Sequence, residues 1–234
     1  MQQILITGSN RGIGLALAKA CVAQGDKVFA TCRQPASADA LQTLAQEHPD
    51  QVTIVPLSVT DESSLNACVD AVMSVTDTID ILINNAGIYP KAPEHTQLGV
   101  LEADALNYVL QVNSVAPVMI TQALLPLLKS STNPRVVMVS SQMGSIERAG
   151  TSGFSYRMSK AAVNMATKVL SGMLRGDNVT VITTHPGHVS TDMGGSSAPV
   201  SPDESATGLL SVTNGLTIAD TGKFLNYTGA QLPW

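Results

Sequence analysis

Charged residues are scarce in this sequence, and lysine and arginine form no cluster anywhere along it. Only 13% of the 234 residues are charged, 44% are hydrophobic, and the net charge is −5. Nucleic acids and acidic membranes both attract proteins through basic patches, so neither partner is expected. The composition instead predicts a substantial apolar core and additional apolar surface that a second subunit would cover.

Cysteine is also rare. Cys21, Cys32 and Cys68 are an odd number of thiols, widely spaced and each within an apolar stretch. This pattern is not that of a disulfide framework or a metal site, and it predicts buried free thiols. The first strand-like run begins at Gln3, which leaves no room for the basic and apolar regions of a signal peptide. We therefore expect a cytoplasmic protein.

The length suits one large α/β domain and is too short for two. No repeat, low-complexity segment or linker divides the chain, so residues 1–234 are expected to form a single domain. Residues 105–128 include no charged side chain, but polar residues and prolines interrupt them too densely for a lone bilayer helix. We expect a buried or subunit-facing helix with a kink near Pro117.

Short apolar runs alternate with helical patterns along the chain. Strands are expected at residues 3–7, 27–32, 52–57, 79–83, 135–141 and 179–184. Helices are expected from Gly12 onward, over about 65–75, over about 101–129 and around Tyr156. Near-continuous apolar strands are typical of a parallel sheet that is covered on both faces. The sequence thus predicts an α/β fold, a doubly wound, Rossmann-type parallel sheet with helices on both faces.

A glycine-rich turn joins the first strand to the first helix. Gly8, Gly12 and Gly14 have the spacing G-x-x-x-G-x-G, which is close to the dinucleotide-binding fingerprint. Glycine permits a tight turn and close backbone approach, so a pyrophosphate can lie at the helix N-terminus, where amides and the dipole favour an anion. A glycine turn without a cofactor is the alternative, but the position between a strand and a helix favours cofactor binding.

The end of the second strand discriminates between NAD and NADP. An acidic residue here usually binds the ribose 2′-hydroxyl of NAD, whereas this sequence has Arg33. Arg11, in the glycine turn, is a second cation within reach of a 2′-phosphate, and arginine binds phosphate through forked hydrogen bonds. The alternative is two solvated surface arginines. We expect NADP(H).

Tyr156 and Lys160 lie four residues apart in a stretch that favours a helix, so they should share one face. A nearby ammonium favours tyrosinate, which would lower the pKa of the phenol toward the range of proton exchange at neutral pH. Tyr156 is therefore a candidate general acid or base. The alternative is an ordinary amphipathic helix that carries Tyr and Lys one turn apart. The other motifs of the chain are needed to distinguish the two interpretations.

Other polar segments also follow predicted strands, namely residues 84–87, residues 140–141 and residues 186–187. Because the strands are parallel, their carboxyl ends meet at one edge of the sheet, where ligands bind. Residues 194–201 are expected to form a loop over this site. His185 and His188 are close in sequence, but no third ligand of suitable type lies nearby, so we expect structural roles and no metal.

The chemistry-bearing motifs occur in a fixed order: Thr7-Gly8-x-x-x-Gly12-x-Gly14, Asn84-Asn85-Ala86-Gly87, Asn113, Ser141, Tyr156-x-x-x-Lys160 and Pro186-Gly187. This set resembles the short-chain dehydrogenase/reductase family over residues 3–192. Residues 186–195, 201–205 and 223–234 are similar to those of the C-factor and sniffer-type carbonyl reductases within that family. The resemblance covers essentially the whole chain.

The resemblance implies NADPH-dependent reduction of an aldehyde or ketone to an alcohol, with Tyr156 as the proton donor. Lys160 would lower the phenol pKa and hold the nicotinamide ribose. Ser141 would hydrogen-bond the carbonyl oxygen, with Ser140 as an alternative because the gap to Tyr156 is slightly long. Asn113 would shape its helix and hold a water for proton relay. The alternative function is a cofactor-binding signalling or regulatory protein of the C-factor type with little or no turnover.

The resemblance also implies which residues bind the cofactor. They are Gly8, Asn10, Arg11, Gly12, Ile13, Gly14, Arg33, Ser58, Val59, Asn85, Ala86, Gly87, Tyr156, Lys160, Pro186, Gly187, Val189 and Thr191. Ser58 departs from the family, which usually has an aspartate there near the adenine, so the adenine contact would either be weaker or be made by the Val59 backbone. The uncharged helix that ends near residue 128 and the Tyr156 helix would pair with symmetry mates in a homodimer, or in a tetramer.

Overall fold

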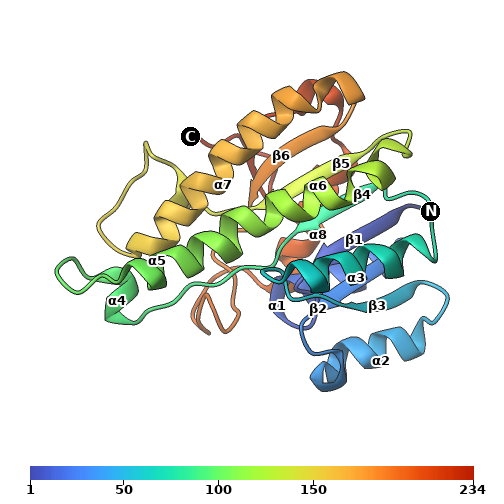
Figure 1. The fold of residues 1–234 in the computed structure, drawn as a ribbon, viewed down its shortest axis with the longest axis horizontal. Helices are drawn as coiled ribbons and strands as arrows, with labels where there is room; N and C mark the ends of the chain where they lie inside the picture. The colour runs from blue at the N-terminus through green and yellow to red at the C-terminus, as the bar shows by residue number, and fades with distance from the viewer.

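Seven parallel strands form the centre of the fold (Figure 1). The computed structural model describes residues 1–234. Its strands are β1 Gln3–Thr7, β2 Lys27–Cys32, β3 Val52–Pro56, β4 Ile81–Asn84, β5 Arg135–Val139, β6 Thr180–His185 and β7 Phe224–Asn226. They lie in the order β3-β2-β1-β4-β5-β6-β7, and every neighbouring pair is parallel. The predicted doubly wound sheet is confirmed, and its strand order reverses between β1 and β4.

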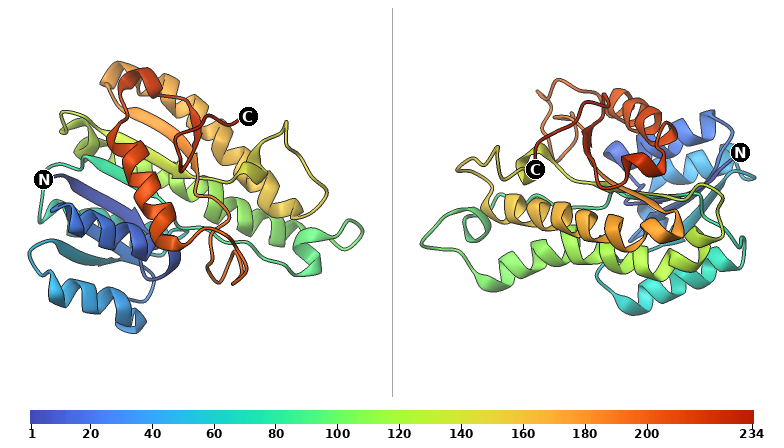
Figure 2. Two further views of the ribbon diagram at one scale, coloured as in Figure 1. Left: turned by 180° about the vertical axis from the view of Figure 1, so that it is seen from behind. Right: turned by 90° about the horizontal axis from the view of Figure 1, so that it is seen from above.

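Helices cover both faces of this sheet (Figure 2). They are α1 Gly12–Ala23, α2 Asp39–Glu47, α3 Glu62–Met73, α4 Pro93–Thr96, α5 Ala103–Leu110, α6 Ala116–Lys129, α7 Phe154–Met173 and α8 Pro202–Asn214. Short 3-10 turns occur at Pro35–Ser37, Gln142–Gly144, Arg175–Asp177 and Ile218–Asp220. Helices α1, α2 and α8 share one apolar cluster with the sheet, and α3, α6 and α7 share a second on the opposite face.

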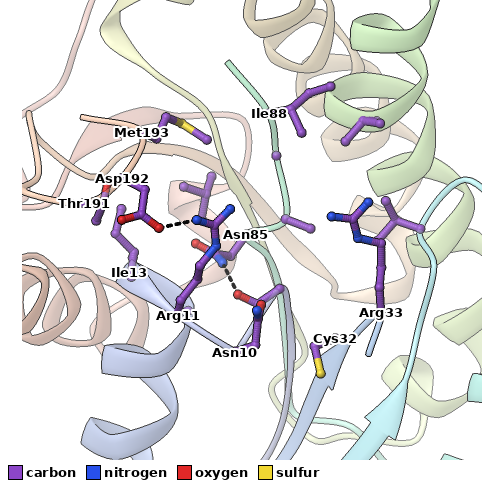
Figure 3. A pocket seen from close by; sticks show the side chains of 18 of the residues that line it. Asn10, Arg11, Ile13, Cys32, Arg33, Asn85, Ile88, Thr191, Asp192 and Met193 are labelled. Carbon is purple, nitrogen blue, oxygen red and sulfur yellow. Dashed lines mark hydrogen bonds and ion pairs between the residues drawn. The ribbon is translucent and has the colours of Figure 1, made fainter. Parts of the chain in front are cut away.

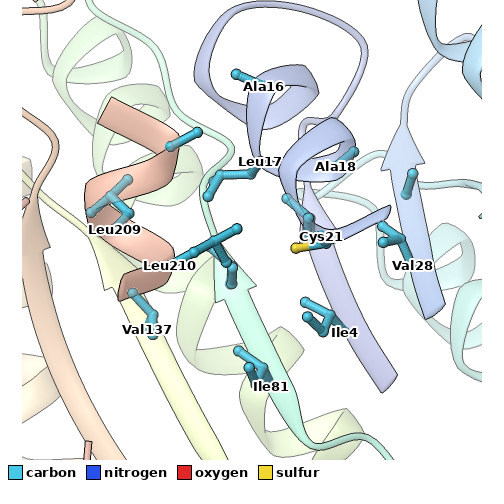
Figure 4. Close-up of a cluster of buried hydrophobic side chains, with 14 of the residues drawn as sticks. Ile4, Ala16, Leu17, Ala18, Cys21, Val28, Ile81, Val137, Leu209 and Leu210 are labelled. Carbon is cyan, nitrogen blue, oxygen red and sulfur yellow. The ribbon is translucent and has the colours of Figure 1, made fainter. Parts of the chain in front are cut away.

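The apolar cluster around α1 joins that helix to β1 and α8. Ile4 on β1, Leu17 on α1 and Leu210 on α8 meet in it, and Figure 4 shows them pointing toward one another. Cys21 lies in the same cluster. All three cysteines of the chain are buried and free, as predicted.

Several boundaries differ from the prediction by a few residues. α3 begins at Glu62 because the Asp61 side chain accepts a hydrogen bond from the Ser64 amide and caps the helix. β5 ends at Val139, so the two following serines leave the strand. α2 and β7 are among the elements that the apolar pattern does not predict. β7 has only three residues and depends on its pairing with β6.

The long helix expected over residues 101–129 consists of α5, a π-helical turn at Gln111–Val115 and α6. The irregularity thus precedes Pro117, which lies in the first turn of α6. Proline has no amide hydrogen for the carbonyl four residues earlier, and a π turn accommodates that missing bond. By length and composition Ala103–Lys129 could cross a membrane, but half of its most apolar window is buried within the protein. This agrees with the expectation of a buried or subunit-facing helix.

Leu124 tests how much the α6 face contributes to stability. This residue is 1% exposed within the second apolar cluster, whereas Leu98 is 91% exposed. We expect Leu124→Ala to lower the free energy of unfolding by about 3 kcal/mol, because the truncation leaves a cavity. Leu98→Ala should change it by less than about 0.5 kcal/mol. Urea unfolding followed by circular dichroism measures both, and equal effects would contradict the placement of α6 against the sheet.

Candidate active site

The glycine turn after β1 is packed so closely that position 14 has no room for a side chain. A Cβ added to Gly14 would lie 2.1 Å from the carbonyl oxygen of Gly8, and Gly8 itself has a φ of +71°. Helix α1 begins at Gly12 with no side-chain cap and no acidic residue in its first turn. Its first amides therefore have no side-chain partner, and the positive end of the helix dipole lies at the wall of a cavity.

Thr7 and Asn85 join this turn to the end of β4. The Thr7 hydroxyl accepts hydrogen bonds from the amides of Asn85 and Ala86, both at 2.9 Å. The Asn85 side-chain amide donates to the carbonyls of Thr7 at 2.9 Å and Gly8 at 3.2 Å. Because β1 and β4 are the strands between which the order reverses, these four bonds hold the two sides of the cavity together.

A cavity of about 610 Å³ opens at this edge, within the range of ligand sites (Figure 3). Most predicted cofactor-binding residues line it: Gly8, Asn10, Arg11, Gly12, Ile13, Gly14, Arg33, Ser58, Val59, Asn85, Ala86, Gly87, Tyr156, Lys160, Pro186 and Thr191.

Two predicted cofactor-binding residues lie outside the cavity wall. Gly187 packs against the Tyr227 ring, which a Cβ at that position would approach to 3.0 Å. Val189 is buried and forms a β-bridge with Val200.

Several residues that line the cavity are absent from the sequence-based prediction. They are Cys32, Gln34, Ser37, Leu57, Thr60, Ile88, Tyr108, Val112, Val139, Ser190, Asp192, Met193 and Pro202. Many of these residues immediately follow a strand or are next to a predicted site residue. Their position near the end of a strand could therefore have predicted that they line the cavity. Tyr108 and Val112 come from the α5 and π-helical segment, and only the packing of that segment brings them to the cavity.

The two arginines of the cavity have different surroundings. Arg11 forms an ion pair with Asp192, which follows β6, and Figure 3 shows the two side chains directed at each other. Arg33 is exposed and takes part in none of the ion pairs of the chain, which are Arg11–Asp192, Lys129–Asp177 and Lys223–Asp220. The sequence prediction assigns both arginines to one phosphate, but Asp192 competes for Arg11.

Tyr156 and Lys160 are both buried on the inner side of α7. The Lys160 Nζ lies 5.5 Å from the centre of the Tyr156 ring and donates a hydrogen bond to the Val139 carbonyl at 2.8 Å. Burial lowers the pKa of Lys160 to about 8. The shared helix face is confirmed.

The predicted direction of the Tyr156 pKa shift is wrong for this structure. Burial raises the pKa of Tyr156 to about 12, a hydrogen bond with Ser141 opposes that rise, and the neighbouring Tyr89 adds to it. Removal of water around the phenol disfavours the phenolate, and the lysine at ring distance does not offset that loss.

The two serines after β5 face different neighbours. The Ser140 hydroxyl donates to the Lys160 carbonyl at 3.3 Å, and the Ser140 amide donates to the Thr184 carbonyl at 2.8 Å. These bonds connect β5 with α7 and β6. The Ser141 hydroxyl accepts from the Met143 amide at 3.1 Å, and its proximity to the Tyr156 phenol lowers the pKa of that phenol. Of the two alternatives, Ser141 is the serine that lies near the phenol, whereas Ser140 lines the cavity and Ser141 does not.

Asn113 lies in the π-helical turn and is buried. Its side chain accepts a hydrogen bond from the Ile88 amide at 2.8 Å and donates to the Ile88 carbonyl at 2.9 Å and the Ser159 hydroxyl at 3.0 Å. Asn113 therefore attaches the segment after β4 to the helix that carries Tyr156. The water relay that the resemblance implies for this residue stays a prediction.

The two histidines near the site have separate contacts. His185 is buried, burial lowers its pKa to about 4, and its Nδ1 has no hydrogen-bond partner. The His188 Nε2 lies 2.9 Å from the Gly194 carbonyl oxygen. This contact joins two parts of the loop that follows β6. No group of three or more His, Cys, Asp or Glu residues lies close enough to hold a metal ion.

Known structures closely match this fold. The NADPH-bound carbonyl reductase from chicken fatty liver superposes with a TM-score of 0.93 at 36% identity, over 100% of this chain and 99% of that one. The carbonyl reductase Sniffer of D. melanogaster superposes with a TM-score of 0.94 at 35% identity, over 100% of both chains.

Relatives from other organisms also match in sequence. An uncharacterized oxidoreductase of Schizosaccharomyces pombe is 34% identical over 98% of this chain and 96% of its own length. The C-signal protein of Myxococcus xanthus is 38% identical over 68% of this chain and 95% of its own length. The family model described as short chain dehydrogenase matches residues 2–200. As the order of its motifs indicates, the chain belongs to the short-chain dehydrogenase/reductase family.

Proposed function

We propose that this protein reduces an aldehyde or ketone to an alcohol with NADPH. The observation that carries the proposal is the buried pair of Tyr156 and Lys160 at the wall of the cavity that the glycine turn opens, with Ser141 near the phenol. The NADPH-bound chicken enzyme and a Pseudomonas aeruginosa carbonyl reductase in complex with NADP, which is 31% identical to this chain, support the choice of cofactor and reaction.

The residues along the cavity fit a phosphorylated dinucleotide. The side-chain-free cradle at Gly14 and the uncapped start of α1 would hold the pyrophosphate. Arg33, which has no acidic partner, would bind the 2′-phosphate, and Ser58 and Val59 line the region expected for the adenine. When bound, the reduced nicotinamide supplies the hydride.

The protein's own contribution is a proton and a hydrogen bond at the carbonyl oxygen. Reduction places negative charge on that oxygen, so an acid and a donor beside it stabilise the transition state. With a pKa raised to about 12, Tyr156 is protonated at neutral pH and is therefore in its donor form. Ser141 would donate the second hydrogen bond. Lys160, with a pKa of about 8, stays mostly protonated at neutral pH and would hold the ribose hydroxyls.

Tyr156→Phe tests the proposed proton donor. The variant keeps the ring but has no proton to give, so turnover should fall by at least about 100-fold, the scale of general acid catalysis. NADPH binding should remain nearly intact. Loss of reduced-cofactor absorbance with a panel of aldehydes, ketones and quinones measures turnover, and fluorescence titration measures binding. Strong activity in the variant would exclude Tyr156 as the donor.

A second candidate function is that of a cofactor-binding signalling protein with little turnover. The observation that favours it is the 38% identity with the C-signal protein of Myxococcus xanthus. The presence of Ser141, Tyr156 and Lys160 together supports the enzyme instead. Wild-type protein that binds NADPH tightly but reduces no member of the carbonyl panel would favour the signalling function.

The two arginines allow a test of cofactor preference. Arg33→Gln should weaken NADPH binding about 30-fold and leave NADH binding nearly unchanged, because only NADPH carries the 2′-phosphate that a charge-assisted hydrogen bond would hold. Asp192→Asn releases Arg11 from an exposed ion pair and should strengthen NADPH binding about twofold to fivefold. Dissociation constants for both cofactors provide the measurement. An equal loss for NADPH and NADH in Arg33→Gln would contradict the phosphate assignment.

We also propose a homodimer, with a tetramer as the alternative. Met165, Val169 and Met173 recur every four residues on α7 and are exposed. Val115, at the end of the π-helical turn, and Met119, in the first turn of α6, are also exposed. α7 packs against α5 and the π-helical turn, so these residues lie on adjoining helices (Figure 1). Such apolar helix faces suit a self-complementary interface.

Light scattering at micromolar concentration should therefore give twice the monomer mass, or four times that mass for a tetramer. Val169→Glu places a charge in the middle of the exposed α7 stripe and should shift the protein to monomers, because an unpaired charge is costly to bury. The exposed Lys19→Glu on α1 serves as a control for the charge change and should leave the mass unchanged. A monomeric wild-type protein would refute the proposed interface.

A further inference from the structure

A second tyrosine covers one side of the Tyr156 phenol. The Tyr89 ring, in the segment after β4, lies with its centre 4.5 Å from that of Tyr156, and the two planes are tilted by 45°. Ile88 and Tyr156 line the cofactor cavity, whereas Tyr89 does not. Tyr89 therefore contacts the phenol from outside that cavity.

Two further segments meet Tyr89 at the same point. A Cβ added to Gly153, just before α7, would lie 3.0 Å from the methyl carbon of Met143 and 3.1 Å from the Tyr89 hydroxyl oxygen. Met143 follows Ser141 in the short turn after β5. The residues after β4, after β5 and before α7 thus form one wall beside the phenol, with an aromatic ring and a thioether as its side chains.

This wall is held by hydrogen bonds on both sides. The Arg157 guanidinium donates to the carbonyls of Ser152 at 2.7 Å, Met143 at 3.3 Å and Arg148 at 3.4 Å, so one side chain of α7 fastens the whole connection from β5. On the other side, Asn113 holds both backbone groups of Ile88, the residue before Tyr89. Tyr89 is therefore positioned in advance of any ligand.

We propose that Tyr89 forms the aromatic wall of the carbonyl subsite and makes the enzyme prefer substrates whose carbonyl carries a planar aromatic substituent. The proposal rests on the reductase function proposed above. A carbonyl oxygen that reaches Tyr156 and Ser141 has the cofactor cavity on one side, so its substituent extends toward the other side, along Tyr89 and Met143. A planar ring there would pack in the offset or edge-to-face manner of aromatic pairs, and the methionine sulfur also favours aromatic contacts.

The test compares benzaldehyde, which is aromatic, with hexanal, which is aliphatic. Tyr89→Ala should lower kcat/KM for benzaldehyde about tenfold, mainly through KM, and lower it for hexanal less than about threefold, because only benzaldehyde loses an aromatic partner. Tyr89→Phe keeps the ring and should retain the wild-type ratio of the two substrates. Equal losses for both aldehydes in Tyr89→Ala, or the same change in Tyr89→Phe, would overturn the proposal.

A binding measurement keeps this test independent of turnover. Benzamide is a planar aromatic carbonyl compound that can be titrated calorimetrically into NADPH-loaded protein. Its dissociation constant should rise about tenfold in Tyr89→Ala and stay near the wild-type value in Tyr89→Phe, while NADPH affinity is the same in all three proteins. Wild-type protein that reduces no carbonyl but shows this pattern would refute the reductase function and leave the aromatic subsite standing. No binding of benzamide to the wild type would refute the subsite.

Discussion

The close approach of Gly14 to the Gly8 carbonyl is the constraint on which the site depends. With no Cβ between them, α1 can begin directly above the end of β1, and its free amides reach the cavity. The hydrogen bonds of Thr7 and Asn85 then hold the end of β4 at a set position beside that turn. Because the order of strands reverses here, the segments that follow β1 and β4 diverge and leave room for a ligand between them.

Burial is the main cause of the pKa shifts of both Tyr156 and Lys160, because no carboxylate pairs with either side chain. Each group loses water, and each pKa moves in the direction that favours the neutral form: upward for the phenol and downward for the amine. A phenol kept protonated suits proton donation to a carbonyl that gains negative charge. The Lys160 amine, which takes part in no ion pair, hydrogen-bonds the Val139 carbonyl.

A chain of contacts connects an irregularity in one helix with the Tyr156 phenol. Pro117 removes a backbone hydrogen-bond donor, and the preceding turn is π-helical. Asn113 in that turn holds Ile88, and the next residue, Tyr89, lies against Tyr156. The helix is therefore both a structural support and part of the site. The same α5 to α7 region also exposes the apolar stripe that suits a second subunit.

The amino-acid sequence by itself determined the family, the parallel sheet and most of the cavity lining, because these depend on local patterns: apolar runs, glycine spacing and polar residues at strand ends. Only the tertiary structure decided that Ser141 and not Ser140 lies near the phenol, that Asp192 pairs with Arg11, and that burial raises the Tyr156 pKa. It also decided the edge strand β7, which three residues cannot specify without β6 beside them. Each of these features depends on side chains or strands that are distant in sequence, and no local pattern encodes which of them become neighbours or how much water they exclude.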